Sequence, residues 1–332
     1  MGESIIDPDI KKTFPWKLAA IFLLFSAAII LVGIFYYESQ KNKIFTEQEN
    51  NLSAIASLKI NQILSWRNER IEDATVISHD KPLIRSIEHF LKDGNKEGKS
   101  ELFDWMKSVR NEYDFTNVLI ADTSFKIRLS VDPSDTLFGE SIKKEMKSSK
   151  SYHRIMMTDL HRSKEVPFIH LDLLIPLFDS VNKNRVAVGV AILRIDPAEV
   201  LFPLIQSWPT PSKSSETLLL RREKDSILYL NELRHSKNTA LKLILPLSNK
   251  NLLGTKAANG FEGVAEGIDY RNIPVVGSLH KIPGTSWFMV AKVDKDEILL
   301  PLKRYSFMIT MVVILLILIN ASIFGFWIWQ QR

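Results

Sequence analysis

The chain has 332 residues, a formal net charge of +5 and no cysteine. Lysine and arginine are interleaved with aspartate and glutamate, and this pattern argues against a nucleic-acid-binding surface. Without cysteine there is no disulfide framework, so a domain of this size must rely on its own hydrophobic core. For an exported domain, this favours a bacterial or archaeal envelope over an animal cell surface.

Two long apolar segments, residues 18–37 and 306–329, contain no charged residue. A helix rises about 1.5 Å per residue, so each segment is long enough to cross a hydrocarbon core of about 30 Å. The first segment ends in Phe35, Tyr36 and Tyr37, which suit a membrane–water boundary and offer no small-residue cleavage site. We therefore expect two spans, with the segment between them on one side and both termini on the other.

The expected orientation of the chain in the membrane follows from the size of the central segment more than from the distribution of Lys and Arg. Lys11, Lys12 and Lys17 precede the first span, but Lys41 and Lys43 follow it, so the positive-inside bias is weak. A large, easily exported middle segment favours cytoplasmic termini. We expect a multi-pass protein of the inner (cytoplasmic) membrane, in contact with the lipid bilayer, whose central domain lies in the periplasm or outside the cell.

The first part of the central segment has a helical pattern. Between residues 38 and 90 there is no glycine, and apolar residues recur at spacings of three, four and seven, at Ile60, Ile63, Leu64, Ile71 and Ala74. This predicts a long helix that continues from the first span and is interrupted near residues 78–82. Two further helices are expected, over residues 82–91 and 100–112.

The pattern changes to strands after residue 115. A hairpin is expected at residues 117–122 and 126–132, a helix at 139–149, and three more strands at 155–159, 167–178 and 185–195. A connecting helix over 196–206, with Asp196 as its N-cap, leads into a Pro- and Ser-rich linker over 207–214. Five more strands are expected at 216–222, 226–231, 263–270, 273–281 and 286–293, before a helix over 294–304 that enters the second span.

This order predicts an α+β fold in which a long N-terminal helix and two tandem PAS-like units with antiparallel sheets are flanked by two transmembrane helices. Seven divisions are expected: a cytoplasmic N-terminus (1–17), a span (18–37), a helical region (38–114), a membrane-distal unit (115–206), a membrane-proximal unit (207–304), a second span (305–329) and a short cytoplasmic end (330–332).

The stretches at residues 59–67, 170–177 and 283–287, together with this order of elements, resemble the double-Cache sensor region of bacterial receptors, especially sensor histidine kinases of two-component systems. The resemblance covers residues 18–329. It implies a homodimer that binds an unknown small molecule and signals across the membrane. The amino-acid-binding branch carries a Tyr/Arg/Trp/Tyr signature that Trp66 and Arg67 match only in part, so amino-acid binding is not implied.

The strand around residues 168–174 offers the best candidate ligand contacts. Alternation places Phe168, His170, Asp172 and Leu174 on one face and core residues on the other. The first face either lines a pocket or is a solvated outer face. The small residues Ala187, Gly189 and Ala191 of the next strand leave room for a ligand or, more simply, for a packed helix. The candidate ligand-binding set is Arg128, Ser130, Tyr152, Arg154, Asp159, His161, Phe168, His170 and Asp172.

Several chemistries are not supported. The histidines at 153, 161 and 170 lack the close spacing of a dedicated metal site, so we expect no metal and no cofactor. No nucleophile elbow or zinc-protease motif occurs, and Asp132 and Asp135 are interpreted as turn-capping residues. There is no phospho-accepting histidine helix and no nucleotide-binding box, so we expect no enzymatic activity of this chain; the full receptor would supply a kinase.

The predicted function is that of the extracytoplasmic sensor and transmembrane portion of a receptor, most simply a PAS-containing histidine kinase. Receptors of this type continue into an output domain beyond the second span, and the chain stops shortly after that span. Two alternatives remain: the sensor of a chemoreceptor or diguanylate cyclase, and an envelope interaction protein that senses no small molecule.

Overall fold

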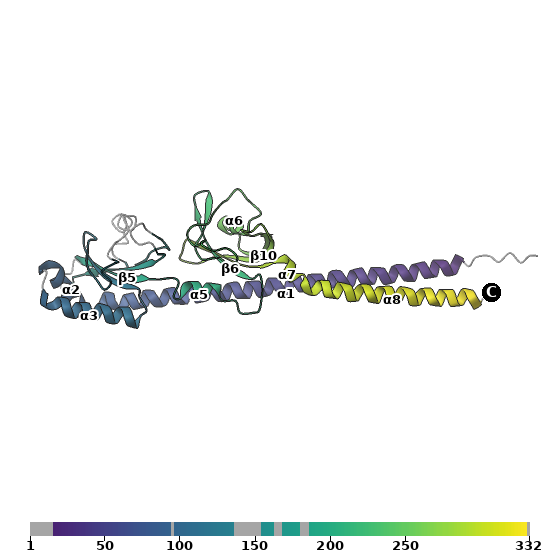
Figure 1. Ribbon diagram of the computed structural model, residues 1–332, viewed down its shortest axis with the longest axis horizontal. Helices are drawn as coiled ribbons and strands as arrows, with labels where there is room; N and C mark the ends of the chain where they lie inside the picture. The colour runs from purple at the N-terminus through teal and green to yellow at the C-terminus, as the bar shows by residue number, and fades with distance from the viewer. Residues whose placement is uncertain (1–15, 94–95, 136–153, 163–167, 180–185, 331–332) are drawn as a thin grey trace, which may run out of the picture. The chain divides into compact units, whose positions relative to one another are not determined.

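The computed structural model describes residues 16–93, 96–135, 154–162, 168–179 and 186–330 (Figure 1). These form two compact units: Glu49–Asp294, and a second unit built from the chain up to Gln48 together with the chain from Lys295 onward. The helix expected over residues 139–149 lies outside the described residues. Two helices, α1 and α8, are long and apolar enough to cross a membrane, as the sequence predicted.

Three helices precede the first sheet: α1 (Trp16–His79), α2 (Lys81–Asp93) and α3 (Lys96–Glu112). The interruption expected near residues 78–82 is present at Asp80. Its carboxylate accepts a hydrogen bond of 3.0 Å from the backbone N–H of Leu83 and so caps α2. Pro82 lies in the first turn of α2, where its missing N–H has no intrahelical partner to lose.

The first sheet contains β1 (Asn117–Asp122), β2 (Ile127–Ser130), β3 (Met156–Met157), β4 (Leu171–Phe178) and β5 (Ala187–Ile195). Every pairing is antiparallel, and the strand order is β2-β1-β5-β4-β3. This sheet, with α2 and α3, is the first lobe. All five strands were predicted from the sequence, although β3 is shorter than expected.

The second sheet contains β6 (Glu216–Glu223), β7 (Ser226–Tyr229), β8 (Ile244–Pro246), β9 (Gly263–Ile268), β10 (Pro274–Lys281) and β11 (Trp287–Asp294), in the order β8-β7-β6-β11-β10-β9. This sheet and the short helix α6 (Leu253–Ala258) form the second lobe. Apart from the added edge strand β8, the order repeats that of the first lobe, which confirms the prediction of two related units. The sequence analysis missed β8 and α6 because three and six residues are too few to show periodicity.

The connecting helix is shorter than predicted, because α5 covers only Leu201–Gln206. The prediction that Asp196 caps it was wrong: the N-cap position is Val200, which makes no side-chain capping bond. Asp196 instead accepts a hydrogen bond of 2.8 Å from the N–H of Ala198, within the turn before the helix.

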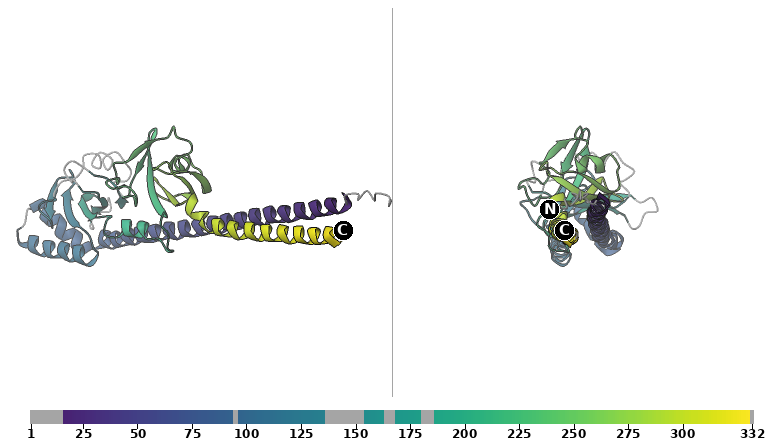
Figure 2. Two further views of the ribbon diagram at one scale, coloured as in Figure 1. Left: turned by 45° about the vertical axis from the view of Figure 1, so that its right-hand side comes forward. Right: turned by 90° about the vertical axis from the view of Figure 1, so that its right-hand side faces the viewer.

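The part of α1 in Glu49–Asp294 runs along both sheets (Figure 2). One continuous hydrophobic core joins this part of the helix to both sheets. Ile63 and Trp66 of α1 are buried in the same cluster as Leu173 of the first sheet and Met289 of the second. The predicted small-residue face of β5 is covered by a helix: a Cβ on Gly189 would lie 2.8 Å from Leu91 of α2. The helix alternative is therefore confirmed at that face.

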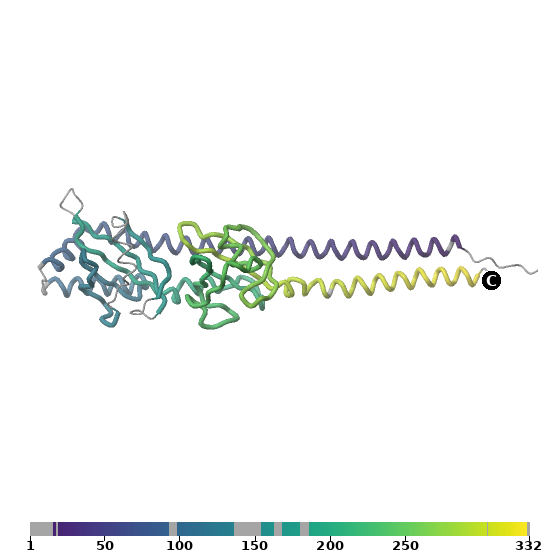
Figure 3. The backbone as a smooth tube through the Cα atoms, turned by 90° about the horizontal axis from the view of Figure 1, so that it is seen from above, coloured from purple at the N-terminus to yellow at the C-terminus, as the bar shows by residue number. Residues whose placement is uncertain are grey.

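In the unit that contains the two long apolar segments, the N-terminal part of α1 and the helix α8 (Leu300–Gln330) run side by side, and the short helix α7 (Lys295–Ile298) precedes α8 (Figure 3). Asn320 donates hydrogen bonds to Ser26 Oγ (3.0 Å) and to the carbonyl of Phe22 (3.3 Å). A Cβ on Gly33 would lie 2.8 Å from Val313, so the two helices approach closely there. Small residues and interhelical amide bonds are the usual means of helix association in membranes.

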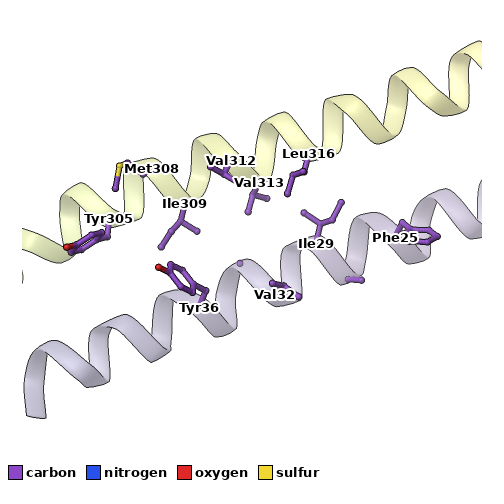
Figure 4. Close-up of a pocket in the computed structure, with 12 residues that line it drawn as sticks. Phe25, Ile29, Val32, Tyr36, Tyr305, Met308, Ile309, Val312, Val313 and Leu316 are labelled. Carbon is purple, nitrogen blue, oxygen red and sulfur yellow. The ribbon is translucent and has the colours of Figure 1, made fainter.

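A groove of about 620 Å³ runs between these two helices, and its lining is almost entirely apolar (Figure 4). Phe25, Ile29 and Val32 line it from α1, and Val312 and Leu316 from α8. A groove without polar partners is compatible with lipid chains or with other apolar helices.

The contact between the spans can be tested by oxidative cross-linking, because the natural chain has no cysteine. We expect the double variant Ser26→Cys/Asn320→Cys to form an intramolecular disulfide in membranes, since the two native side chains are in hydrogen-bond contact. The matched control is Leu24→Cys/Asn320→Cys, because Leu24 is exposed on another side of α1. Equal cross-linking of both pairs, measured by gel mobility, would contradict this packing.

Candidate ligand-binding site

The two faces of β4 differ in what covers them. Leu171, Leu173 and Ile175 belong to the core shared with the helices, whereas Leu174 packs in a separate cluster with Leu119 and Ile192 on the opposite face. The predicted alternation along this strand is therefore confirmed. Asp172 lies on the opposite face and is fully buried, and His170 is 1% exposed. The alternative of a solvated outer face is wrong for both residues.

The central feature of this face is Arg194 on β5, whose side chain is completely buried. Its Nε donates to Asp172 Oδ1 at 2.9 Å, its Nη2 donates to Asp172 Oδ2 at 3.1 Å, and its Nη1 pairs with Asp135 Oδ1. Burial alone would lower the pKa of Arg194, but the two carboxylates outweigh that effect and raise it. The guanidinium is thus firmly charged inside the protein.

The register of the first sheet places polar side chains of neighbouring strands in one row. Arg194 is opposite Asp172 on one side and opposite Asn117 on the other. Asn117 is fully buried, and its amide donates to Ser130 Oγ (3.0 Å) and to the carbonyl of Asp135 (2.9 Å). The network therefore crosses the sheet from β4 through β5 and β1 to β2.

The turn after β2 supplies the second carboxylate. Asp132 caps it as predicted, by accepting hydrogen bonds from the N–H (2.9 Å) and hydroxyl (2.6 Å) of Ser134. The capping role predicted for Asp135 is not what the structure shows, since its carboxylate pairs with Arg194. Burial raises the pKa of Asp135 in spite of the nearby guanidinium, as expected for a carboxylate that is incompletely compensated.

Two histidines lie beside Asp172. The rings of His161 and His170 are 4.1 Å apart in an edge-to-face arrangement, and His170 Nε2 is 3.9 Å from Asp172 Oδ2. Burial lowers the pKa of His170 to about 4, so its ring is neutral at pH 7. The ring of Phe168 lies 5.4 Å from that of His170.

The structure brings together His161, Phe168, His170, Asp172 and, through Asn117, Ser130. Arg128 is not part of this group: its side chain is 43% exposed and pairs with Asp122 at 3.4 Å. Arg154 is exposed and lines a different cleft of about 350 Å³, with His79, Lys81 and Phe178 among its other walls. Tyr152 lies outside the described residues.

Sequence reasoning missed Arg194, Asn117 and the ionic role of Asp135. A signal for Arg194 was available: it is the only charged residue in the otherwise apolar strand β5. A charged side chain at a core position of a strand requires a buried partner. Of its two partners, Asp172 was among the candidate residues, but Asp135 could not have been named as a partner, because it is far from Arg194 in sequence and reaches it from a turn.

Asp159, one of the predicted ligand contacts, connects the two lobes through its carboxylate. Its carboxylate accepts hydrogen bonds from Trp287 Nε1 (2.6 Å) and Ser286 Oγ (2.5 Å), and it lies 3.0 Å from Arg221 Nη1. Arg221 also donates to the carbonyl of Leu160 at 3.1 Å. A short segment of the first lobe is therefore anchored to β6 and β11 of the second.

The second lobe also buries a cation. Lys292 on β11 is fully buried and lies 2.9 Å from Asp269 Oδ2 and 3.1 Å from Glu216 Oε2. Hydrogen bonds from Arg271 and Lys292 outweigh the effect of burial and lower the pKa of Asp269.

A polar cleft of about 460 Å³ borders this second group. Glu216 lines it beside Thr217, and the buried hydroxyl of Thr217 has no hydrogen-bond partner among the residues that the structure describes. This cleft is the second candidate for ligand binding.

The link through Asp159 generates a stability prediction. Asp159→Ala removes three polar contacts, and since this carboxylate is about one-third exposed, we expect a loss of about 1–2 kcal/mol, visible as a lower melting temperature of the full chain in detergent. Asp225→Ala, at an exposed turn between β6 and β7, is the matched control. Identical melting temperatures of the two variants would show that Asp159 does not hold the lobes together.

No protein-family model matches the chain, and no curated protein sequence matches it. Solved structures do match. The sensory domain of the Campylobacter jejuni chemoreceptor Tlp3 (CcmL) aligns with a TM-score of 0.53 and 14% identity over 78% of this chain and 98% of that chain. The same receptor's ligand-binding domain in complex with L-norvaline gives 0.55 and 13% over 77% and 94%. The chain therefore shares the fold of these sensory domains, which agrees with the fold that the resemblance implied.

Proposed function

We propose that this chain is the sensor and transmembrane portion of a bacterial receptor, and that its first lobe binds a small molecule beside the Arg194 network. The single observation that supports this site most strongly is the fully buried charged row on the sheet face opposite the helices. Buried charges are costly unless they are paired, and strongly perturbed groups cluster at functional sites. The shared fold with chemoreceptor sensory domains supports the sensing role.

The charges of this network favour a ligand that carries an ammonium group. Among the side chains that the structure describes there, one guanidinium faces two carboxylates, Asp172 and Asp135. Burial raises the pKa of Asp135 although Arg194 lowers it, so a second cation beside this carboxylate would favour its charged form. A cationic group near Asp135 would complete the balance, and an oriented ammonium would gain charge-assisted hydrogen bonds.

Aliphatic amino acids are the first candidates of this kind. Solved structures of the Tlp3 domain contain isoleucine or L-valine, and both compounds carry an ammonium group. The sequence signature of the amino-acid-binding branch is incomplete in this chain, so the proposal rests on the charge of the buried network and on the fold. Asp135 is the least buried of the three charged residues and is the group we assign to the ligand.

Signalling would follow from ligand-dependent bias between two arrangements of the lobes. A ligand shifts such an equilibrium only by the difference between its affinities for the two states. The contact of Asp159 with Trp287 and the core shared by α1 and both sheets would carry the bias between the lobes. The helices α1 and α8 would pass it through the inner membrane in a multi-pass homodimer, with no catalytic step in this chain.

The output of the full receptor has two candidates. The resemblance of sequence stretches favours a histidine kinase of a two-component system, whereas the solved structures with the same fold belong to chemoreceptors. The fold comparison therefore supports the second candidate, a chemoreceptor. A non-sensing envelope protein would instead bind none of the ligands tested below.

The proposal predicts a ligand-dependent rise in melting temperature of the full chain in detergent. L-Isoleucine, L-valine and L-norvaline should each stabilise the folded protein, by about 2.7 kcal/mol at a concentration one hundred times the Kd. N-Acetyl-L-isoleucine, which lacks the ammonium group, should give no shift. Asp135→Asn should abolish the shift by L-isoleucine, whereas the exposed control Asp225→Asn should retain it.

Two outcomes would contradict this proposal. If none of the three amino acids shifts the wild-type protein, the assigned ligand class is wrong. If Asp135→Asn retains the shift and Thr217→Val loses it, ligand binding belongs to the polar cleft of the second lobe, which Thr217 lines.

A further inference from the structure

We propose that His161, His170 and Asp172 form a binding site for a divalent transition-metal ion, best suited to Zn²⁺. One ligand atom from each side chain lies within 4.8 Å of the other two. Two imidazole nitrogens and one carboxylate oxygen are a ligand set that Zn²⁺ commonly uses, and a fourth position remains for water or another ligand. The sequence analysis expected no metal, so this inference comes from the three-dimensional arrangement alone.

The backbone fixes the two histidines side by side. His161 and His170 form an antiparallel bridge in which each N–H donates to the other's carbonyl at 3.1 Å. Directly opposed residues of this kind project neighbouring side chains to the same face. Asp172 follows His170 by two residues along β4 and so shares that face.

Each histidine is oriented as a metal ligand would be. His161 Nδ1 lies 2.8 Å from the carbonyl of Asp159, and His170 Nδ1 lies 3.1 Å from the carbonyl of Phe168. A carbonyl only accepts hydrogen bonds, so both Nδ1 atoms donate to their carbonyls, and the two Nε2 atoms are the ring nitrogens left to contact a metal ion. Donation from the second ring nitrogen to a carbonyl is the usual support of a metal-bound histidine.

The lone pair of His161 is otherwise unused. Its Nε2 is buried and has no hydrogen-bond partner in the described part of the protein. An unsatisfied buried acceptor costs free energy comparable to a lost hydrogen bond, so it calls for an explanation. A cation between Nε2 of His161, Nε2 of His170 and Oδ2 of Asp172 would satisfy it.

Neighbouring charges tolerate such a cation. Asp172 already accepts from Arg194, but each carboxylate oxygen has a second lone pair. Asp135 offsets the positive charge of Arg194, so the described group is net negative when both histidines are neutral. Tetrahedral Zn²⁺ places its ligand atoms about 3.3 Å apart, so small side-chain rotations would close the site from its present spacing.

The proposed metal site lies close to the contact between the two lobes. The carbonyl of Asp159 holds His161, and the carboxylate of the same residue holds Trp287 of the second lobe. Metal binding would therefore hold His161 in place next to Asp159, the residue of the first lobe that contacts Trp287. The inference stands apart from the proposed amino-acid site, because its ligands are the two histidines and not Asp135.

The test uses the full chain in detergent, stripped of metal with a chelator and titrated with Co²⁺ while visible absorption is recorded. We expect the bands of tetrahedral Co²⁺ with one ion bound per chain, displacement of Co²⁺ by Zn²⁺, and a higher melting temperature with Zn²⁺. His161→Gln should weaken Co²⁺ binding at least about tenfold, whereas His235→Gln, at an exposed loop of the second lobe, should leave it unchanged.

The melting temperature of metal-free His161→Gln serves as the folding control. If this temperature is lower than that of the metal-free wild type, His170→Gln is used as the second variant. Absence of the Co²⁺ bands in wild type, or equal Co²⁺ affinity of wild type and both histidine variants, would overturn the inference. His161→Gln should weaken Co²⁺ binding and retain the rise in melting temperature with L-isoleucine, so the two proposals fail separately.

Discussion

The fold of the first lobe depends on the placement of one buried guanidinium. Arg194 lies at the centre of the sheet with no access to water, and its charge is acceptable there only because Asp172 pairs with it bidentately and Asp135 completes the arrangement. A shift of β5 by one residue would turn Arg194 into the helix-facing core. The ion network therefore specifies the strand register, while the surrounding apolar clusters supply most of the driving force for folding.

The second lobe repeats this design with different residues. Lys292 on β11 is opposite Glu216, the first residue of β6, just as Arg194 on β5 is opposite Asn117, the first residue of β1. In both lobes a cation on the central strand meets carboxylates brought by neighbouring segments, Asp172 and Asp135 in one and Glu216 and Asp269 in the other. The residues that surround the cation differ between the two lobes. A difference in ligand between the lobes would arise from these residues.

Much of this architecture could be predicted from sequence, because strands and helices leave local periodic patterns. The break of the long helix at Asp80, the strands of both sheets and the buried face of β4 all follow from spacing. The site could be predicted only in part. His161 and His170 are nine positions apart and meet through a backbone bridge, and Asp135 reaches Arg194 from a turn, so neither contact leaves a signal in local spacing. Short elements such as β8 and α6 could not be predicted for a related reason: each contains fewer than two full periods, so no pattern repeats within it.

The most direct test of this account is a double-mutant cycle on Arg194 and Asp172, with unfolding of the full chain in detergent as the measurement. We predict that Arg194→Met or Asp172→Leu alone destabilises the protein by about 3–5 kcal/mol, because the first leaves both carboxylates without their cation and the second leaves Arg194 with Asp135 as its one remaining described carboxylate. The double variant should cost at least about 2 kcal/mol less than the sum of the two single variants. Additive effects of the two substitutions would contradict the claim that this pair organises the first lobe.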